Sequence, residues 1–184
     1  ASWNGTFGTL STGIGGVINF GVDALAFGLD GILYAGDAFG TAGSIVVNNT
    51  AQWNGVQWSG MGSGITTSVS ALLTDPESGV IYATGALTTV ETQRYVPPLT
   101  LAQWNGYRWI PSDFQVPGVS DEANALLIVP SDQSLYVAGD MKGIGTCAAV
   151  AQIPNIGRAE AYPTVQFRNA GGGLAVRQPL GVHI

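Results

Sequence analysis

A tryptophan-containing segment recurs along the chain at nearly constant spacing, and this repeat limits the possible folds. The segment AQWNGVQW at 51–58 returns as AQWNGYRW at 102–109, and less complete copies begin at Ala1 and Ala151. Equivalent positions in the four copies are 50, 51 and 49 residues apart; they are Trp3, Trp53, Trp104 and Ile153. The chain has five tryptophans, and all of them, including Trp58 and Trp109, fall inside this segment. Such regularity indicates one supersecondary unit repeated along the chain.

A second block of each unit keeps the same spacing. An apolar run opening with Ala-Leu leads through a turn to an aliphatic residue and a tyrosine, and a glycine follows the tyrosine closely. The tyrosines are Tyr34, Tyr82 and Tyr136, and the glycines are Gly36, Gly85 and Gly139. Short β-prone runs bounded by turn residues predict strands. Each unit is therefore expected to hold four antiparallel strands.

The Asn-Gly pair inside each tryptophan segment predicts a tight hairpin. Asn and Gly tolerate the positive φ angles that both central residues of a type I′ turn require. A two-residue loop at Asn54-Gly55 would place Trp53 opposite Val56 and Ala51 opposite Trp58. Because strand side chains alternate between faces, these four residues would share one apolar face. The copy at 102–109 would bury Tyr107 in the same way.

A period of about 50 residues with four short strands is typical of a β-propeller blade. The Leu-Tyr-x-x-Gly and Ala-x-Trp-Asn-Gly-x-x-Trp signatures resemble kelch-like and delta-60 type propeller repeats, which implies an all-β propeller fold. The expected division is a leading strand at 1–20 and repeats at 21–59, 60–110 and 111–157. Residues 158–184 are a closing strand or a linker, and the run Tyr162–Phe167 resembles a β-domain that follows such repeats in phage tail-like proteins.

Three blades would form only part of a ring, because propellers usually have four to eight blades. Uncovered blade faces and strand edges are avoided in stable proteins. Two chains could close a six-bladed ring in which each leading strand, Trp3 to Leu10, completes the partner's last blade. Copies could also pack into a larger assembly, or further blades could belong to a longer protein, since Ala1 falls inside a repeat copy. We expect self-association through the open blade faces.

Charge and composition argue against several functions. The chain has 12 acidic and 6 basic residues, net charge −6, and its bases are scattered, whereas nucleic-acid binding needs clustered bases. No apolar run reaches the length of a membrane helix. The single cysteine, Cys147, excludes an intrachain disulfide and a cysteine-based zinc site. The single histidine, His183, gives little basis for a catalytic triad. We therefore expect no enzymatic activity, cofactor or metal.

Four residues are candidates for contact with a ligand or partner. Asp37 and Asp140 follow equivalent glycines and could bind a cation, although turn formation explains them better. Loops on a rigid scaffold commonly carry recognition, and the variable loops here are 37–46, 88–98 and 140–146. The longest of them offers Arg94 and Tyr95.

The sequence thus predicts a non-enzymatic β-propeller module for interaction or assembly, with a protein or glycan partner. A cell-surface, extracellular, envelope or virion-associated setting, including that of a phage-like structural protein, suits its lysine-poor composition. A lectin-like, carbohydrate-binding propeller is the first alternative, and a subdomain of a hydrolase is the second.

Overall fold

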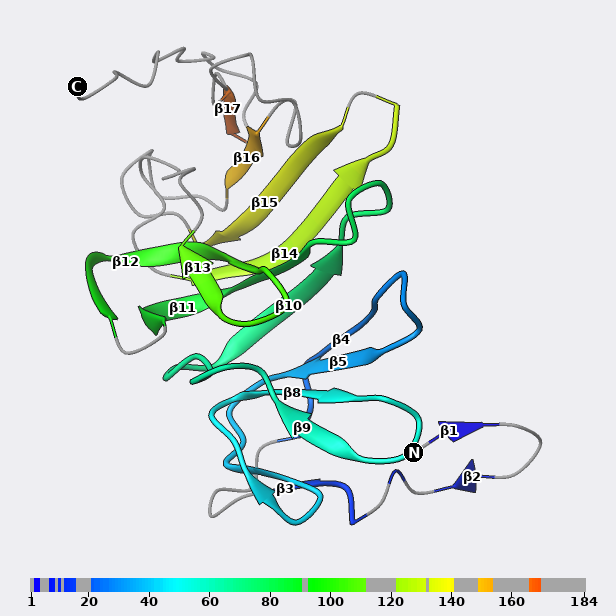
Figure 1. Ribbon diagram of the computed structural model, residues 1–184. Helices are drawn as coiled ribbons and strands as arrows, with labels where there is room; N and C mark the ends of the chain where they lie inside the picture. Colours follow the sequence, from blue (N-terminus) through cyan, green and yellow to red (C-terminus); the bar gives the residue numbers. More distant parts are fainter. Residues whose placement is uncertain are drawn as a thin grey trace.

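The protein is all-β in its described part, as the sequence predicts (Figure 1). The computed structural model describes residues 2–3, 7–8, 10, 12–15, 21–90, 93–111, 122–131, 133–140, 149–153 and 166–169. Every regular element in these ranges is a β-strand, and the sheets are antiparallel. In the same ranges, no helix has the length and apolarity needed to cross a membrane.

Three four-stranded sheets follow one another along the chain, each with its strands in sequence order. The first sheet contains β4 (Ala24–Phe27), β5 (Leu33–Gly36), β8 (Thr50–Trp53) and β9 (Trp58–Gly60). The second contains β10 (Val69–Thr74), β11 (Ile81–Val90), β12 (Gln93–Trp104) and β13 (Trp109–Pro111). The third contains β14 (Glu122–Val129), β15 (Ser134–Asp140), β16 (Ala149–Ile153) and β17 (Gln166–Asn169). The segment 158–184 therefore contributes β17 as the fourth strand of the third sheet.

Five short strands lie at the start of the chain and within the first unit. β1 (Ser2–Trp3) pairs with β2 (Phe7–Gly8), and β3 (Ile14–Gly15) pairs with β6 (Thr41–Ala42), which also pairs with β7 (Ile45–Val46). Residues 1–20, expected as one leading strand, thus contain a hairpin and a third strand. The variable loop at 37–46 is tied to this leading segment through the β6–β7 hairpin.

The repeated sequence produces the same strand register around the tyrosines in all three sheets. Tyr34, Tyr82 and Tyr136 each face a glutamine of the third strand, and these glutamines are Gln52, Gln103 and Gln152. Gly36, Gly85 and Gly139 each face a small apolar residue at or near the start of the first strand, and these residues are Ala24, Val69 and Ala123. The pairing beside the tyrosines is therefore the same in the three sheets, and a register shift in the second and third sheets compensates for the extra residue that separates Gly85 and Gly139 from their tyrosines.

The tryptophan hairpins have a longer turn than the sequence predicts. Trp53 pairs with Trp58, and Trp104 pairs with Trp109, so four residues form each loop. Asn54 does not adopt a positive φ, and its Oδ1 accepts hydrogen bonds from the backbone N–H groups of Val56 (3.0 Å) and Gln57 (2.9 Å). Asn105 makes the same two bonds in the second hairpin. The type I′ prediction is wrong because the asparagine side chain holds a wider, Asx-type loop instead.

The wider loop also moves two residues out of the core. Val56 and Tyr107, expected on the buried face, are 80% and 87% exposed at the loop tips. The tryptophans stay paired, with ring centroids 5.4 Å apart for Trp53 and Trp58 and 5.6 Å apart for Trp104 and Trp109. Both pairs are tilted by 52°. Such tilted aromatic pairs are favourable beyond their buried area.

The predicted long loop at 88–98 is a strand extension rather than a loop. β11 and β12 extend beyond the other two strands of the sheet and stay paired with each other as far as Val90 and Gln93. Arg94 lies opposite Thr89 in this extension. The register shifts on both sides of Leu87, which pairs with Leu99. Between Leu99 and Arg94 the β12 strand contains Pro97-Pro98, which has no N–H to donate, and prolines within sheets are confined to edges and bulges.

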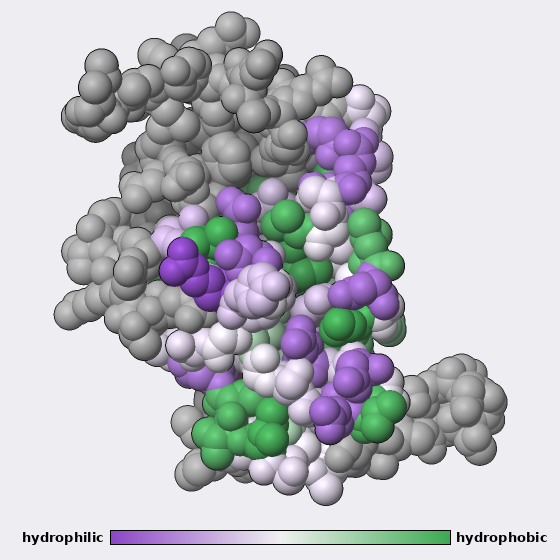
Figure 2. All heavy atoms as spheres, in the orientation of Figure 1, coloured by the Kyte–Doolittle hydropathy of each residue, from purple (hydrophilic) through white to green (hydrophobic). Residues whose placement is uncertain are grey.

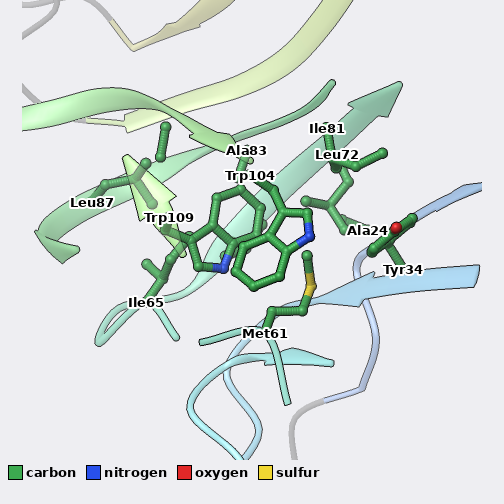
Figure 3. Packing of buried hydrophobic residues seen from close by; sticks show 12 residues of the cluster. Ala24, Tyr34, Met61, Ile65, Leu72, Ile81, Ala83, Leu87, Trp104 and Trp109 are labelled. Atoms are coloured by element: carbon green, nitrogen blue, oxygen red, sulfur yellow. The ribbon is translucent and has the colours of Figure 1, made fainter. Parts of the chain in front are cut away.

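The main core lies between the first and second sheets (Figure 3). Trp104 and Trp109 of the second sheet pack with Met61 and Ile65 of the connecting segment, and with Ala24 and Tyr34 of the first sheet. A second cluster places Trp58, Ala35 and Ala51 of the first sheet against Phe39 and Ala42, with Leu10 and Ile14 beside them. The tryptophan-bearing face of each of these two sheets therefore covers structure that comes earlier in the chain.

A hydrogen bond from an indole crosses each of these two layers. Trp109 Nε1 donates to Thr50 Oγ1 of the first sheet (3.2 Å), and both residues are buried. Trp58 Nε1 donates to the Leu10 carbonyl (3.0 Å). A buried indole N–H is costly without an acceptor, so these bonds fix how each tryptophan face sits on its neighbour.

Replacing Thr50 by valine tests this contact. Thr50→Val keeps the side-chain volume but removes the hydroxyl acceptor of Trp109, and we expect a loss of about 1–3 kcal/mol in the free energy of unfolding. Urea unfolding measures the change. In a Trp109→Phe background the same substitution should cost much less, because no indole N–H then needs the hydroxyl; an equal cost in both backgrounds would rule out this role.

Gly36 allows the first two sheets to approach closely. A Cβ at this position would lie 2.7 Å from Val69 Cγ1 of the second sheet. We expect Gly36→Ala to lower the free energy of unfolding by about 1–3 kcal/mol, as overpacking does. Gly40→Ala is the matched control, since a Cβ there meets no atom within 4 Å. Adding Val69→Ala should recover part of the loss, and the absence of any recovery would contradict this explanation.

Candidate functional site

Acidic residues gather at the end of the sheets where the first strand starts and the second strand ends. Asp23 and Asp37 flank the paired residues Ala24 and Gly36 in the first sheet. In the third sheet Glu122 pairs directly with Asp140. The equivalent places of the second sheet, beside Val69 and Gly85, hold Ser68 and Ala86. Asp37 and Asp140 thus occupy equivalent places in two sheets, with the second sheet between them.

The backbone of Asp37 is held by two other segments. Its N–H donates to the Asn49 carbonyl (3.2 Å), and its carbonyl accepts from the Val69 N–H (3.4 Å) at the start of β10. Asn49 has a φ of 61° and donates through Nδ2 to the Ile65 carbonyl (2.6 Å). Asn48 donates through Nδ2 to Ser63 (3.1 Å) in the same connecting segment. Asp37 is therefore fixed at the junction between the first two sheets.

Burial makes Asp37 an unusual carboxyl group. It is 4% exposed, and burial is the main reason that its pKa lies above the ordinary value of 3.8. The nearby charge of Asp23 raises the pKa further, while a hydrogen bond from the Ala38 backbone N–H partly lowers it. Removing a carboxylate from water disfavours its charged form. The folded protein therefore holds the proton of Asp37 more tightly than the unfolded chain does.

This proton affinity predicts a pH-dependent effect of Asp37→Asn. At about pH 3 the carboxyl is protonated in both folded and unfolded chains, so wild type and variant should unfold at similar temperatures. As pH rises through 3.8 the unfolded chain ionises first, and the wild type loses stability until the folded group also ionises. Thermal unfolding at about pH 7 should then show Asp37→Asn as the more stable protein.

A matched variant separates charge from packing. Asp23→Asn removes only the neighbouring charge and should shift neutral-pH stability in the same direction by less. If Asp37→Asn changed stability equally at acidic and neutral pH, the effect would be one of packing and not of ionisation.

Two further acids act in turns at the opposite end of the sheets. Asp30 Oδ1 accepts from the Ile32 N–H (3.0 Å), and Asp75 Oδ1 accepts from the Glu77 N–H (2.9 Å). The Ser78 hydroxyl donates to Asp75 Oδ2. These bonds hold the β4–β5 and β10–β11 turns, which is the role that the sequence predicts for most of its acids.

The same turn acids act on the repeat tyrosines. Burial raises the pKa of Tyr34, and the charge of Asp30 and a hydrogen bond with its side chain raise it further. Burial, with the charge of Asp75 second, raises the pKa of Tyr82 to about 12. Both phenols stay protonated well beyond neutral pH and act as neutral packing groups in the sheets, and that of Tyr34 also hydrogen-bonds with Asp30.

The structure describes the predicted contact residues unequally. Of the four predicted contact residues, Asp37 is the one whose side chain the structure describes. The backbone places Arg94 in β12 opposite Thr89 of β11, with Tyr95 following it, and Asp140 ends β15. The side chains of these three lie outside the described part of the chain, as does that of Trp3.

Sequence reasoning missed Asp23, Glu122 and several exposed apolar residues. Only the strand pairing shows that these acids lie beside other acids, because Ala24 faces Gly36 and Glu122 faces Asp140. Hydrophobic side chains reach the visible surface in several separate patches (Figure 2). Leu25 and Phe27 of β4 and Leu127 of β14 are among the exposed ones.

No group of three or more histidine, cysteine, aspartate or glutamate side chains suited to a metal ion occurs among the described residues. Comparisons with protein-family models, with curated proteins and with solved structures found no match for this chain.

Proposed function

We propose that this chain is a β-propeller module that works by binding and assembly and not by catalysis. The first support is the order of the sheets. Each is a four-stranded antiparallel meander, and the first strands lie next to one another: β10 packs against β4 of the preceding sheet and against β14 of the following one. Propeller blades place their first strands around the axis in this manner.

The observation that carries the proposal is the directional packing of the sheets. Ile81, Ala83 and Trp109 of the second sheet are buried against the first. Leu135 and Val137, which follow the same register in the third sheet, are also buried, and β14 packs against β10 and β11. One face of a sheet thus repeatedly covers the opposite face of its predecessor. A module built in this way can continue the same contact with another copy.

The proposed biological setting of the protein rests on the resemblance of its repeat signatures to kelch-like and delta-60 type repeats. We propose a structural or surface protein of the extracellular, envelope or virion-associated kind, in which propeller repeats serve as an interaction scaffold. The acidic net charge of −6 favours a protein partner over nucleic acid.

Solution mass tests the assembly function directly. A chain of 18.9 kDa that assembles should show a mass of two or more chains by light scattering, with the fraction assembled rising with concentration. A mass of one chain at every concentration would contradict assembly between copies.

Carbohydrate binding is a second candidate, favoured by the exposed aromatic ring of Tyr107. This ring lies at the tip of the β12–β13 hairpin, where it has an apolar face open to solvent. Glycan-array binding that is lost in Tyr107→Ala, and retained in Val56→Ala at the equivalent tip, would support this function. An array without any bound glycan would exclude the glycans tested.

A further inference from the structure

Two apolar surfaces lie on opposite outer sides of the three-sheet stack. The leading face is the uncovered β4 part of the first sheet's tryptophan-bearing side, which carries Leu25 and Phe27; the rest of that side packs on Phe39 and Ala42. The trailing face is the side of the third sheet that carries Leu127 of β14 and Tyr136 of β15. Leu25, Phe27 and Leu127 are 59%, 66% and 59% exposed.

Equivalent positions inside the stack show what normally covers the leading face. Leu25 faces Ala35, and its counterpart Leu72 faces Ala83 in the second sheet. Leu72 is only 9% exposed because the first sheet lies on it. Phe27 faces Leu33, and its counterpart Ile128 faces Leu135 in the third sheet and is 7% exposed. Leu72 and Ile128 are thus buried where a like sheet precedes them, and the remaining two counterparts, Thr74 and Leu126, are partly buried.

The trailing face has internal counterparts of its own. Leu127 faces Tyr136, as Ala26 faces Tyr34 and Leu73 faces Tyr82. Tyr34 and Tyr82 are buried, and each belongs to a sheet that another sheet follows, whereas Tyr136 is partly exposed. The trailing face therefore corresponds to the faces of the first and second sheets that pack on the sheet following them.

We propose that the trailing face of one copy of this chain packs onto the leading face of a second copy, repeating the internal junction between sheets. This inference rests on the proposed assembly function and names the surfaces that perform it. The two surfaces differ, so the contact is head-to-tail: it closes into a ring if the rotation permits and otherwise extends as a filament.

Aspartate substitutions on the two faces test the inference in the full chain. Leu25→Asp and Leu127→Asp each place a charge on one face, and each should weaken association of the pure variant by at least about tenfold. Both residues are exposed, so folding should persist, and circular dichroism with thermal unfolding verifies it. Val56→Asp, at an exposed loop tip outside both faces, is the control and should associate like the wild type.

Mixing the two variants distinguishes head-to-tail packing from other arrangements. Leu25→Asp retains an intact trailing face and Leu127→Asp an intact leading face, so the mixture should form a one-to-one complex that neither variant forms with itself. Light scattering and native mass spectrometry with one isotope-labelled variant measure this complex.

Each result decides the matter. Loss of association in both variants with recovery on mixing supports the inference. If the wild type associates and the aspartate variants associate equally well, assembly uses another surface and only the inference fails. If only one variant loses association, like faces pair with like, and if both lose it and mixing restores none, the two faces do not contact each other; either result overturns the inference. A wild type with the mass of a single chain at every concentration overturns the second copy as occupant, together with the assembly function.

Discussion

The packing of one sheet face on another is the interaction on which this structure depends. A four-stranded sheet of this kind has apolar side chains on both faces, so both need cover. The paired tryptophans supply much of that cover, and an indole N–H can find an acceptor across the layer, as that of Trp109 does at Thr50. Because the hydrogen bond and the apolar contact require the same placement, they fix the spacing and orientation of neighbouring sheets together. Gly36 adds the close approach that this spacing requires.

The periodic part of the structure could be predicted from the sequence because it depends on local pattern. Spacing of the tryptophan and tyrosine blocks gave the all-β class and the four antiparallel strands per unit. The hairpin turns could not be settled in this way, because an Asn-Gly pair suits both a type I′ turn and a wider loop that the asparagine side chain closes. At 88–98, departure from the repeat suggested a variable loop, whereas a shifted register lets the extended strands pair past Pro97 and Pro98.

The candidate site was less accessible to prediction because its properties arise between distant segments. Asp37 could be singled out by its place after Gly36, but its burial depends on Asn49 and Val69, which belong to other elements. Asp23 is unremarkable in the sequence and becomes its neighbour only through the pairing of β4 with β5. Tyr107 shows the reverse: a hairpin loop two residues longer than predicted moved a predicted core residue to the surface.

The two outer faces differ in a way that gives assembly a direction. In the first sheet the leading face carries Leu25 and Phe27, whereas the opposite side presents Ala24, Ala26, Tyr34 and Gly36 along the same strands. At the internal junction, Val69 of the second sheet fills the space that Gly36 leaves. Because side chains alternate along each strand, the two faces of a sheet carry different residues and pack on each other as unlike surfaces. This packing favours chains that join head to tail.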